Sequence, residues 1–226
     1  MPEPVRNAEL LRSLGRLVRG LSALFWGLPI TLVVCFQAGQ TDWLRSLGVV
    51  PPLATTGWLL YGLWQMQSFQ RQERVWRNAL DRAKLIAMVN LGLSPFLFWW
   101  NGAPDEPLFE AAVAVLSASA LLFLLNLNLV LQRLSAMLPD ETLRHETRRF
   151  TALNRALLAW TLVLLVAGFI LTRFELLPTA PERSVALMER FSLGLLILFV
   201  LLPLAMTMAL IWKIKETILE SVFGAE

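Results

Sequence analysis

Six long apolar runs alternate with polar gaps along the whole chain. Each run is close to the roughly 20 residues that an α-helix needs to cross the hydrocarbon core of a bilayer. The pattern predicts an all-α, polytopic integral membrane protein with six transmembrane helices. The gaps are short, so residues 1–226 are expected to form one membrane domain. The predicted spans are residues 18–37, 48–67, 85–101, 108–131, 153–173 and 191–212.

Two of the polar gaps differ from the others, because residues 68–84 and 140–152 contain no Gly or Pro and are rich in Arg, Glu and Leu. They predict helix that continues beyond the membrane, with Asp140 as the N-cap of the second extension. A helix over residues 140–172 would be about 50 Å long, whereas the hydrocarbon core is about 30 Å thick. We therefore expect about 15–20 Å of this helix to project from the bilayer.

Short segments before the first, third and fifth spans resemble one another. Each contains a Leu-x-Arg motif, and thirteen residues after each arginine comes a residue that weakens a helix. The arginines are Arg16, Arg82 and Arg155, and the later residues are Pro29, Pro95 and Gly168. This register predicts three helical hairpins, near 13–66, 79–133 and 152–213, as an internal pseudo-threefold repeat; the alternative is a chance similarity in a Leu-rich chain.

Basic residues are distributed unevenly between the gaps. When Arg19, Arg155 and Arg173, which lie at the ends of predicted spans, are counted with the adjoining gap, the odd-numbered gaps from the N-terminus hold 4, 5, 5 and 2 Lys and Arg residues, whereas the even-numbered gaps hold 1, 0 and 3. Sixteen of the twenty basic residues thus lie on one predicted side, and positive charge favours the cytoplasmic side. We expect cytoplasmic N- and C-termini. Compact size and the lack of a targeting segment favour a bacterial inner membrane.

Composition narrows the functional classes. The chain is 56% hydrophobic and 16% charged, with a mean hydropathy of +0.58 and a net charge of +3. Nucleic acid is not an expected partner, since membrane topology already accounts for the basic residues. The lipid bilayer and its anionic headgroups are expected partners instead. One Cys and one His, with no phosphate-binding glycine loop, predict no catalytic site, no cofactor and no metal.

Amide side chains are the deepest polar groups in the predicted spans. Helix rise places Asn90, Asn126 and Asn128 about 8–12 Å inside the membrane from the cytoplasmic interface. They are able to meet across the second hairpin as a small polar site for a neutral or weakly charged solute. The alternative is that they form interhelical hydrogen bonds that only hold the helices together.

Two further sets of residues lie at the predicted cytoplasmic interface. Arg16, Arg82 and Arg155 either anchor their helices at the interface or form a ring that binds an anionic headgroup or phosphate. The mixed-charge gaps either form solvated helix or dock a cytoplasmic protein or membrane complex. The candidate docking residues are Trp76, Arg144, Arg148, Arg149 and Phe150.

These observations predict a non-enzymatic membrane protein that acts as a scaffold, sensor or accessory subunit through its basic cytoplasmic face. The alternative is a small-solute transporter or channel that uses the amides of the second hairpin. Deep carboxylates, which a proton relay would require, do not occur in the predicted spans.

Overall fold

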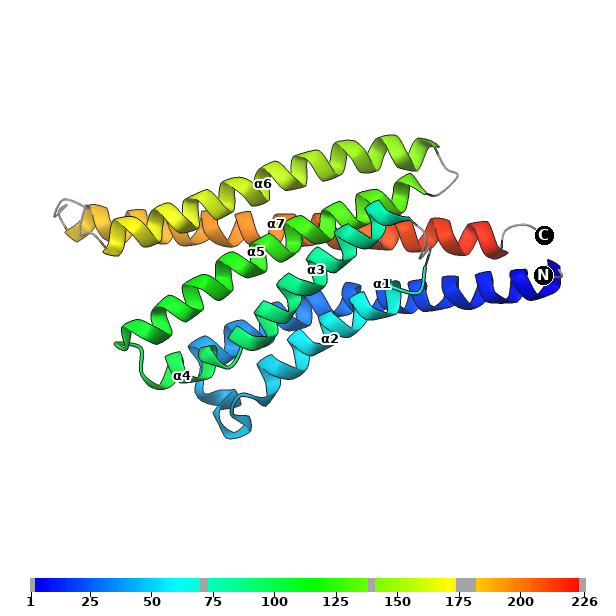
Figure 1. Ribbon diagram of the computed structural model, residues 1–226. Coiled ribbons are helices and arrows are strands. Elements are labelled where there is room, and N and C mark those ends of the chain that lie inside the picture. The colour runs from blue at the N-terminus through cyan, green and yellow to red at the C-terminus, as the bar shows by residue number, and fades with distance from the viewer. Residues whose placement is uncertain (1–2, 70–72, 138–140, 174–181, 224–226) are drawn as a thin grey trace.

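The computed structural model describes residues 3–69, 73–137, 141–173 and 182–223, and all of its regular structure is helical (Figure 1). The all-α prediction is therefore confirmed. In chain order the elements are α1 (Glu3–Gln40), the 3-10 helix η1 (Asp42–Leu47), α2 (Val50–Met66), α3 (Arg74–Leu93), α4 (Phe96–Gly102), α5 (Pro107–Ala136), α6 (Glu141–Arg173) and α7 (Glu182–Phe223).

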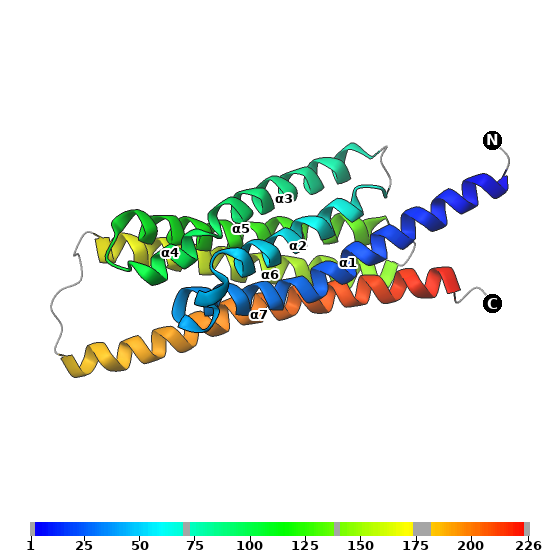
Figure 2. The ribbon, with the colours of Figure 1, turned by 90° about the horizontal axis from the view of Figure 1, so that it is seen from below.

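The long helices run up and down the length of one elongated bundle (Figures 1 and 2). At one end of the bundle α1 begins, α2 ends, α3 begins, α5 ends, α6 begins and α7 ends. We call this the basic end, because the helix segments there carry exposed arginines. η1 and the connection between α4 and α5 lie at the opposite end. The exposed arginines near the basic end are Arg12, Arg16, Arg19, Arg74, Arg77, Arg82, Arg133, Arg148, Arg149 and Arg155.

Five segments of the described residues are long and apolar enough to cross a membrane. They indicate an integral membrane protein in contact with a lipid bilayer. The helix at the predicted second span, α2, has 17 residues, which corresponds to about 26 Å and is close to the lower limit for spanning. The five segments are Arg12–Gln40, Arg74–Gly102, Pro107–Ala136, Thr147–Ala167 and Leu198–Glu220.

The outer surface of these helices is apolar, as lipid contact requires. Trp160 and Val163 on α6 are 64% and 56% exposed, and Leu85 on α3 is 64% exposed. A water-soluble protein rarely exposes such contiguous apolar surface, whereas hydrocarbon solvates it without cost. Trp43, with 79% exposure, and the exposed Trp64 and Trp212 agree with the aromatic belts expected near the ends of membrane helices.

The helices α1 and α2 pack closely, and two glycines make this approach possible. A Cβ added at Gly20 would lie 2.7 Å from the carbonyl oxygen of Gly62 and 2.8 Å from Cγ of Met66. A Cβ at Gly62 would in turn lie 3.0 Å from Cγ of Leu24. Small residues at a helix crossing allow the two backbones to approach, and this increases van der Waals contact where the hydrophobic effect between helices is weak.

The predicted helical extensions are present in part. Helix α6 starts at Glu141 and continues to Arg173, so it has 33 residues and is about 50 Å long. The predicted cap Asp140 lies outside the described residues. The other extension is shorter than predicted, because α2 ends at Met66 and α3 begins only at Arg74.

The prolines act on their helices in different ways. Pro95 separates α3 from α4, whereas Pro29 lies inside α1 and Pro203 inside α7. Helix α6 continues without interruption through Gly168. The copies of the Leu-x-Arg motif also differ in environment, since Leu80 is 1% exposed and its counterpart Leu153 is 57% exposed. These positions therefore differ in their surroundings, and the pseudo-threefold repeat stays a prediction.

Candidate functional site

The three amides predicted to meet across the second hairpin lie in different environments. Asn128 on α5 is fully buried and Asn90 on α3 is largely buried. Asn126 donates to the carbonyl oxygen of Leu122 in its own helix at 2.8 Å. A separation of two residues on a helix corresponds to about 200°, so Asn126 and Asn128 point in nearly opposite directions. No hydrogen bond among the described residues joins these three amides to one another.

A hydrogen-bonded cluster instead joins α5, α6 and α7. Nδ2 of Asn154 donates to Oδ1 of Asn128 at 3.0 Å and lies 3.0 Å from Oγ1 of Thr207. Nδ2 of Asn128 donates to the same Thr207 oxygen at 2.9 Å. All three side chains are at most 1% exposed, and we call them the amide cluster. The Asn128 prediction thus falls on a buried polar site, whereas Asn154 and Thr207 were missed.

Pro203 explains part of this arrangement. A proline has no N–H, so the carbonyl oxygen of Phe199, four residues earlier in α7, loses its usual partner. The hydroxyl of Thr161 on α6 lies 3.2 Å from that oxygen and 2.8 Å from the carbonyl oxygen of Leu157 in its own helix, so its one hydrogen is shared between the two. The carbonyl oxygen of Pro203 itself accepts from Thr207 at 2.8 Å and lies 3.2 Å from Nδ2 of Asn154. Polar side chains of α6 therefore compensate for the proline in α7.

The backbone hydrogen bond lost at Pro95 is also replaced by a side-chain donor, but this donor comes from the same chain segment. The carbonyl oxygen of Leu91 lies four residues before it, and the fully buried hydroxyl of Ser94 donates to this oxygen at 2.9 Å. Oγ1 of Thr56 on α2 lies 3.4 Å from Oγ of Ser94. A buried hydroxyl thus accompanies the helix break, and Ser94 needs no catalytic role to account for its position.

The buried face of α6 is unusually polar. Spacings of four and three residues put Thr147, Thr151, Asn154, Leu158 and Thr161 on one side of the helix, and we call this face the α6 seam. Every member is at most 2% exposed, and four of the five are polar. The hydrogen bonds of Asn154 and Thr161 show that this face is directed toward α5 and α7.

Several buried oxygens on the seam have no protein hydrogen-bond partner. They are Oγ1 of Thr147, Oγ1 of Thr151 and Oδ1 of Asn154. Oδ1 of Asn90 on α3 is also buried without a hydrogen-bond partner. Buried polar atoms are rarely left without a partner, because each unpaired group costs about 1–3 kcal/mol. These oxygens therefore mark positions where a ligand would gain hydrogen bonds.

The predicted arginine set lies outside the bundle core. Arg16, Arg82 and Arg155 are all exposed, on α1, α3 and α6 respectively. No hydrogen bond or ion pair in the described part of the chain joins them. Their exposure fits interfacial anchoring, in which the stem packs on apolar surface and the guanidinium reaches the headgroups. The ring-shaped phosphate site stays a prediction.

The docking prediction is wrong for Trp76. This residue is fully buried, and its ring meets that of Phe69 edge to face at 6.3 Å between centroids. Since α3 begins at Arg74, Trp76 lies in the first turn of the helix, where its ring packs into the bundle core. Arg148 and Arg149 are exposed and Phe150 is 47% exposed, as docking requires, whereas the side chain of Arg144 lies outside the described residues.

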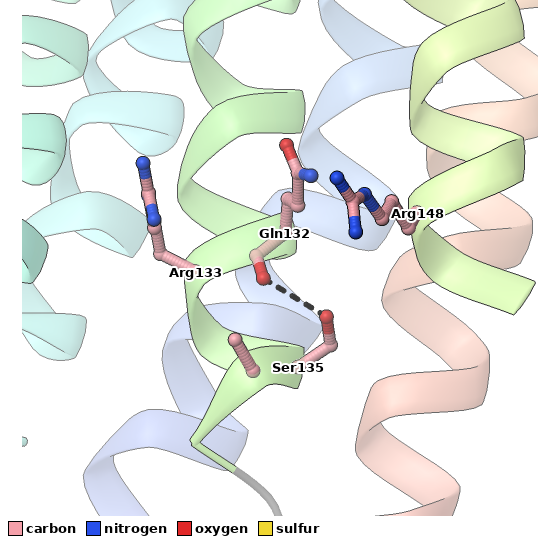
Figure 3. A pocket seen from close by; sticks show the side chains of 5 residues that line it. Gln132, Arg133, Ser135 and Arg148 are labelled. Carbon is pink, nitrogen blue, oxygen red and sulfur yellow. Dashed lines mark hydrogen bonds between the residues drawn. The ribbon is translucent and has the colours of Figure 1, made fainter. Parts of the chain in front are cut away.

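A hollow of about 310 Å³ lies at the basic end, where α5 ends and α6 begins. Figure 3 shows the guanidinium of Arg148 extending from α6 toward the side chain of Gln132 on α5. The side chain of Arg133 lies on the other side of α5, so the two guanidinium groups do not converge. The hydroxyl of Ser135 donates to the carbonyl oxygen of Gln132 at 3.0 Å. The lining residues are Gln132, Arg133, Ser135, Ala136 and Arg148.

One buried charge was also missed. Lys84 on α3 is 6% exposed, and its Nζ lies 3.3 Å from a carboxylate oxygen of Asp81, one turn earlier. The spacing of three residues between opposite charges is a readable sign of such a pair. Within the described ranges no group of three His, Cys, Asp or Glu side chains is close enough to hold a metal ion.

Comparisons with known proteins assign no family to the chain. No protein-family model matches it, and neither a curated protein nor a solved structure matches it.

Proposed function

We propose that this chain is a non-enzymatic, multi-pass inner-membrane protein that acts as a scaffold, sensor or accessory subunit through its basic end. The observation that carries the proposal is the exposed basic and aromatic surface on the projecting start of α6. Sixteen of the twenty basic residues lie in gaps or helix ends on one predicted side, and the corresponding helix ends lie together in the bundle. Membrane topology accounts for this asymmetry, whereas the exposed Arg148 and Arg149 next to Phe150, on a helix longer than the hydrocarbon core is thick, support docking.

The same asymmetry supports a topology. The cytoplasmic side attracts Lys and Arg, so the basic end is cytoplasmic and both termini lie there. In this arrangement α2 is the second of six spans and pairs with α1, while α3 with α4 pairs with α5 and α6 pairs with α7. A compact bundle of this kind suits a bacterial inner membrane.

The projecting part of α6 offers the surface for a partner. Its helix is about 50 Å long and exceeds the hydrocarbon thickness by about 20 Å, so its first turns extend into the cytoplasm. Arg148 and Arg149 are exposed there, next to the half-exposed ring of Phe150. Two guanidinium groups beside an aromatic ring suit an acidic segment of a cytoplasmic protein or of a membrane complex.

Charge reversal at this surface tests the proposal. A protein that binds this surface should co-purify with the wild-type chain from membranes. We expect the amount that co-purifies with the double variant Arg148→Glu/Arg149→Glu to be at least ten-fold lower. The matched control is Arg12→Glu on α1, which changes an exposed arginine at the same end of the bundle. Equal retention of every co-purifying protein by the wild type and the double variant would contradict docking at α6.

A second candidate function is passage of a small uncharged solute past the amide cluster. The specific observation in its favour is Oδ1 of Asn154, a buried acceptor without a protein donor. In proteoliposomes challenged osmotically with glycerol or urea, light scattering would report faster solute entry than in empty liposomes. The double variant Asn128→Leu/Asn154→Leu would abolish this entry, and Asn126→Leu would not. Entry rates equal to those of empty liposomes would reject this candidate and leave the docking proposal intact.

A further inference from the structure

Two threonines of the α6 seam, Thr147 and Thr151, differ from most other helical threonines in the described chain. Thr56, Thr207 and Thr217 each donate to the carbonyl oxygen four residues earlier, at 2.7–3.1 Å, and Thr161, the third threonine of the seam, does so at 2.8 Å. Such a bond satisfies a hydroxyl inside an apolar environment without help from another helix. Thr147 and Thr151 are equally well placed on a helix, but their hydroxyls make no such bond.

These two threonines and Asn154 form one continuous face. Thr147 lies four residues before Thr151, and Asn154 follows three residues later, so their side chains succeed one another over about 10 Å of helix. Each is at most 2% exposed, and each carries an oxygen without a protein partner. No charged side chain belongs to this face, since the neighbouring Arg148 and Arg155 are both exposed.

The hollow at the basic end lies between α5 and α6, on the basic-end side of the contact between Asn128 and Asn154. Gln132, which lines it, follows Asn128 by about one turn of α5, and Arg148, which also lines it, lies between Thr147 and Thr151 in the sequence of α6. A volume of about 310 Å³ is room for about ten water molecules at about 30 Å³ each. A buried hydroxyl or amide oxygen without a partner is destabilising, and a bound water with two to four polar partners removes this cost.

We infer that the α6 seam binds a file of water molecules that enters from the hollow at the basic end and reaches Oδ1 of Asn154. Hydroxyl groups both donate and accept, so water bridges Thr147 to Thr151 and then donates to the Asn154 acceptor. The file ends at Leu158, the one apolar member of the seam, beyond which Thr161 is satisfied by protein groups. This inference rests neither on partner docking nor on solute passage.

Cysteine accessibility tests the inference directly. The single native cysteine, Cys35, is first replaced by Ala, and Thr151→Cys, Leu158→Cys and Arg148→Cys are then made separately. Arg148→Cys reports full exposure at the basic end, and Leu158→Cys reports a dry position on the same face. The labelling rate with a small hydrophilic methanethiosulfonate is measured in membranes, with reagent present on both sides.

We expect Thr151→Cys to react within about ten-fold of the rate of Arg148→Cys and at least ten-fold faster than Leu158→Cys. Labelling of Thr151→Cys as slow as that of Leu158→Cys would overturn the inference. A cysteine is close in size to threonine, so this variant should retain the packing of the seam.

The melting temperature of a second variant gives an independent test, because it should change in opposite directions if the Thr151 hydroxyl is dry and if it binds water. Thr151→Val keeps the shape of the side chain and removes the hydroxyl. If the hydroxyl is unpaired in a dry place, its removal raises the melting temperature in detergent. If it holds water, the melting temperature stays the same or falls, and this is the result we expect. A rise of several degrees for Thr151→Val, with no rise for Thr151→Ser, would contradict bound water.

Discussion

Two parts of the bundle hold their helices together by different means. The helices α1 and α2 approach closely at Gly20 and Gly62 and bury leucines, with Thr31 giving the long-range hydrogen bond recorded between them. The helices α5, α6 and α7 are joined by the amide cluster and by the hydroxyl of Thr161. The first part depends on the fit of apolar surfaces, and the second depends on hydrogen bonds in a medium without water.

The comparison shows where a functional site can be sought. Among the described side chains of α1 and α2, no buried oxygen or nitrogen lacks a hydrogen-bond partner. The interface of α5, α6 and α7 contains buried oxygens that no protein group satisfies, and the hollow at the basic end lies between α5 and α6. The second part is therefore where we seek a ligand.

The largest effect is expected at Trp76, an aromatic residue of α3 that packs into the apolar core shared with α1 and α2. Trp76→Ala removes a fully buried ring and should lower the free energy of unfolding by about 3–5 kcal/mol, measured by denaturant titration in detergent micelles. Trp76→Phe should cost much less, since it keeps an aromatic ring and removes an indole N–H that has no partner. Trp160→Ala, at an outward-facing position, is the control. If it lowered the free energy of unfolding as much as Trp76→Ala does, the assignment of Trp76 to the buried core would be contradicted.

The amide cluster should give the next largest effect. Asn154→Leu breaks bonds to both neighbouring helices and should cost about 1–4 kcal/mol, at about 0.6–2 kcal/mol per interhelical contact. The double variant Asn128→Leu/Asn154→Leu should recover part of the loss, because it leaves fewer unpaired amide groups. Asn126→Leu is the matched control and should be nearly neutral, since its amide bonds only within its own helix. Strict additivity of the two cluster substitutions would show that they do not interact.

A smaller effect is expected at the glycine contact. Gly20→Ala places a methyl group against the Gly62 carbonyl and should cost about 1–3 kcal/mol through overpacking. Gly15→Ala meets no atom within 4 Å and should instead add up to about 1 kcal/mol of stability through helix propensity. If both variants change the melting temperature in the same direction, close packing is not what holds α1 to α2.

The smallest effect is expected where a side chain compensates for proline. Thr161→Val removes the donor to the carbonyl oxygen of Phe199 and should cost about 1 kcal/mol. Thr217→Val near the end of α7 is the control, because its hydroxyl bonds only to Lys213 in the same helix. The melting temperatures of the two variants in the same detergent give the comparison, and a larger fall for Thr217→Val would count against the account of Pro203.

Much of the helix layout was predictable from the order of apolar and polar residues. A gap without Gly or Pro allowed α6 to be extended back to residue 141, and Pro95 correctly marked a discontinuity. The charge asymmetry grouped the helix ends that lie together in the structure. These features are local, because they depend on backbone propensity and on the solvent preference of each residue.

Contacts between helices were less predictable. Trp76 was assigned to a surface because it lies close to a polar gap, but the start of α3 at Arg74 turns its ring inward. Asn154 was treated only as part of an arginine motif, although its spacing from Thr147, Thr151 and Thr161 is a readable buried stripe. The bond from Asn154 to Asn128 and Thr207 depends on how three helices meet, and periodicity within one helix does not determine that.

The central claim is that the basic end and the opposite end of the bundle lie on different sides of the membrane. In a chain with Cys35→Ala, Pro104→Cys and Arg148→Cys are labelled separately in intact cells with an impermeant maleimide. Both positions are exposed, at opposite ends. We predict that Pro104→Cys is labelled in intact cells and Arg148→Cys only after the membrane is opened. Labelling of both positions from the same side would contradict the topology and the function proposed from it.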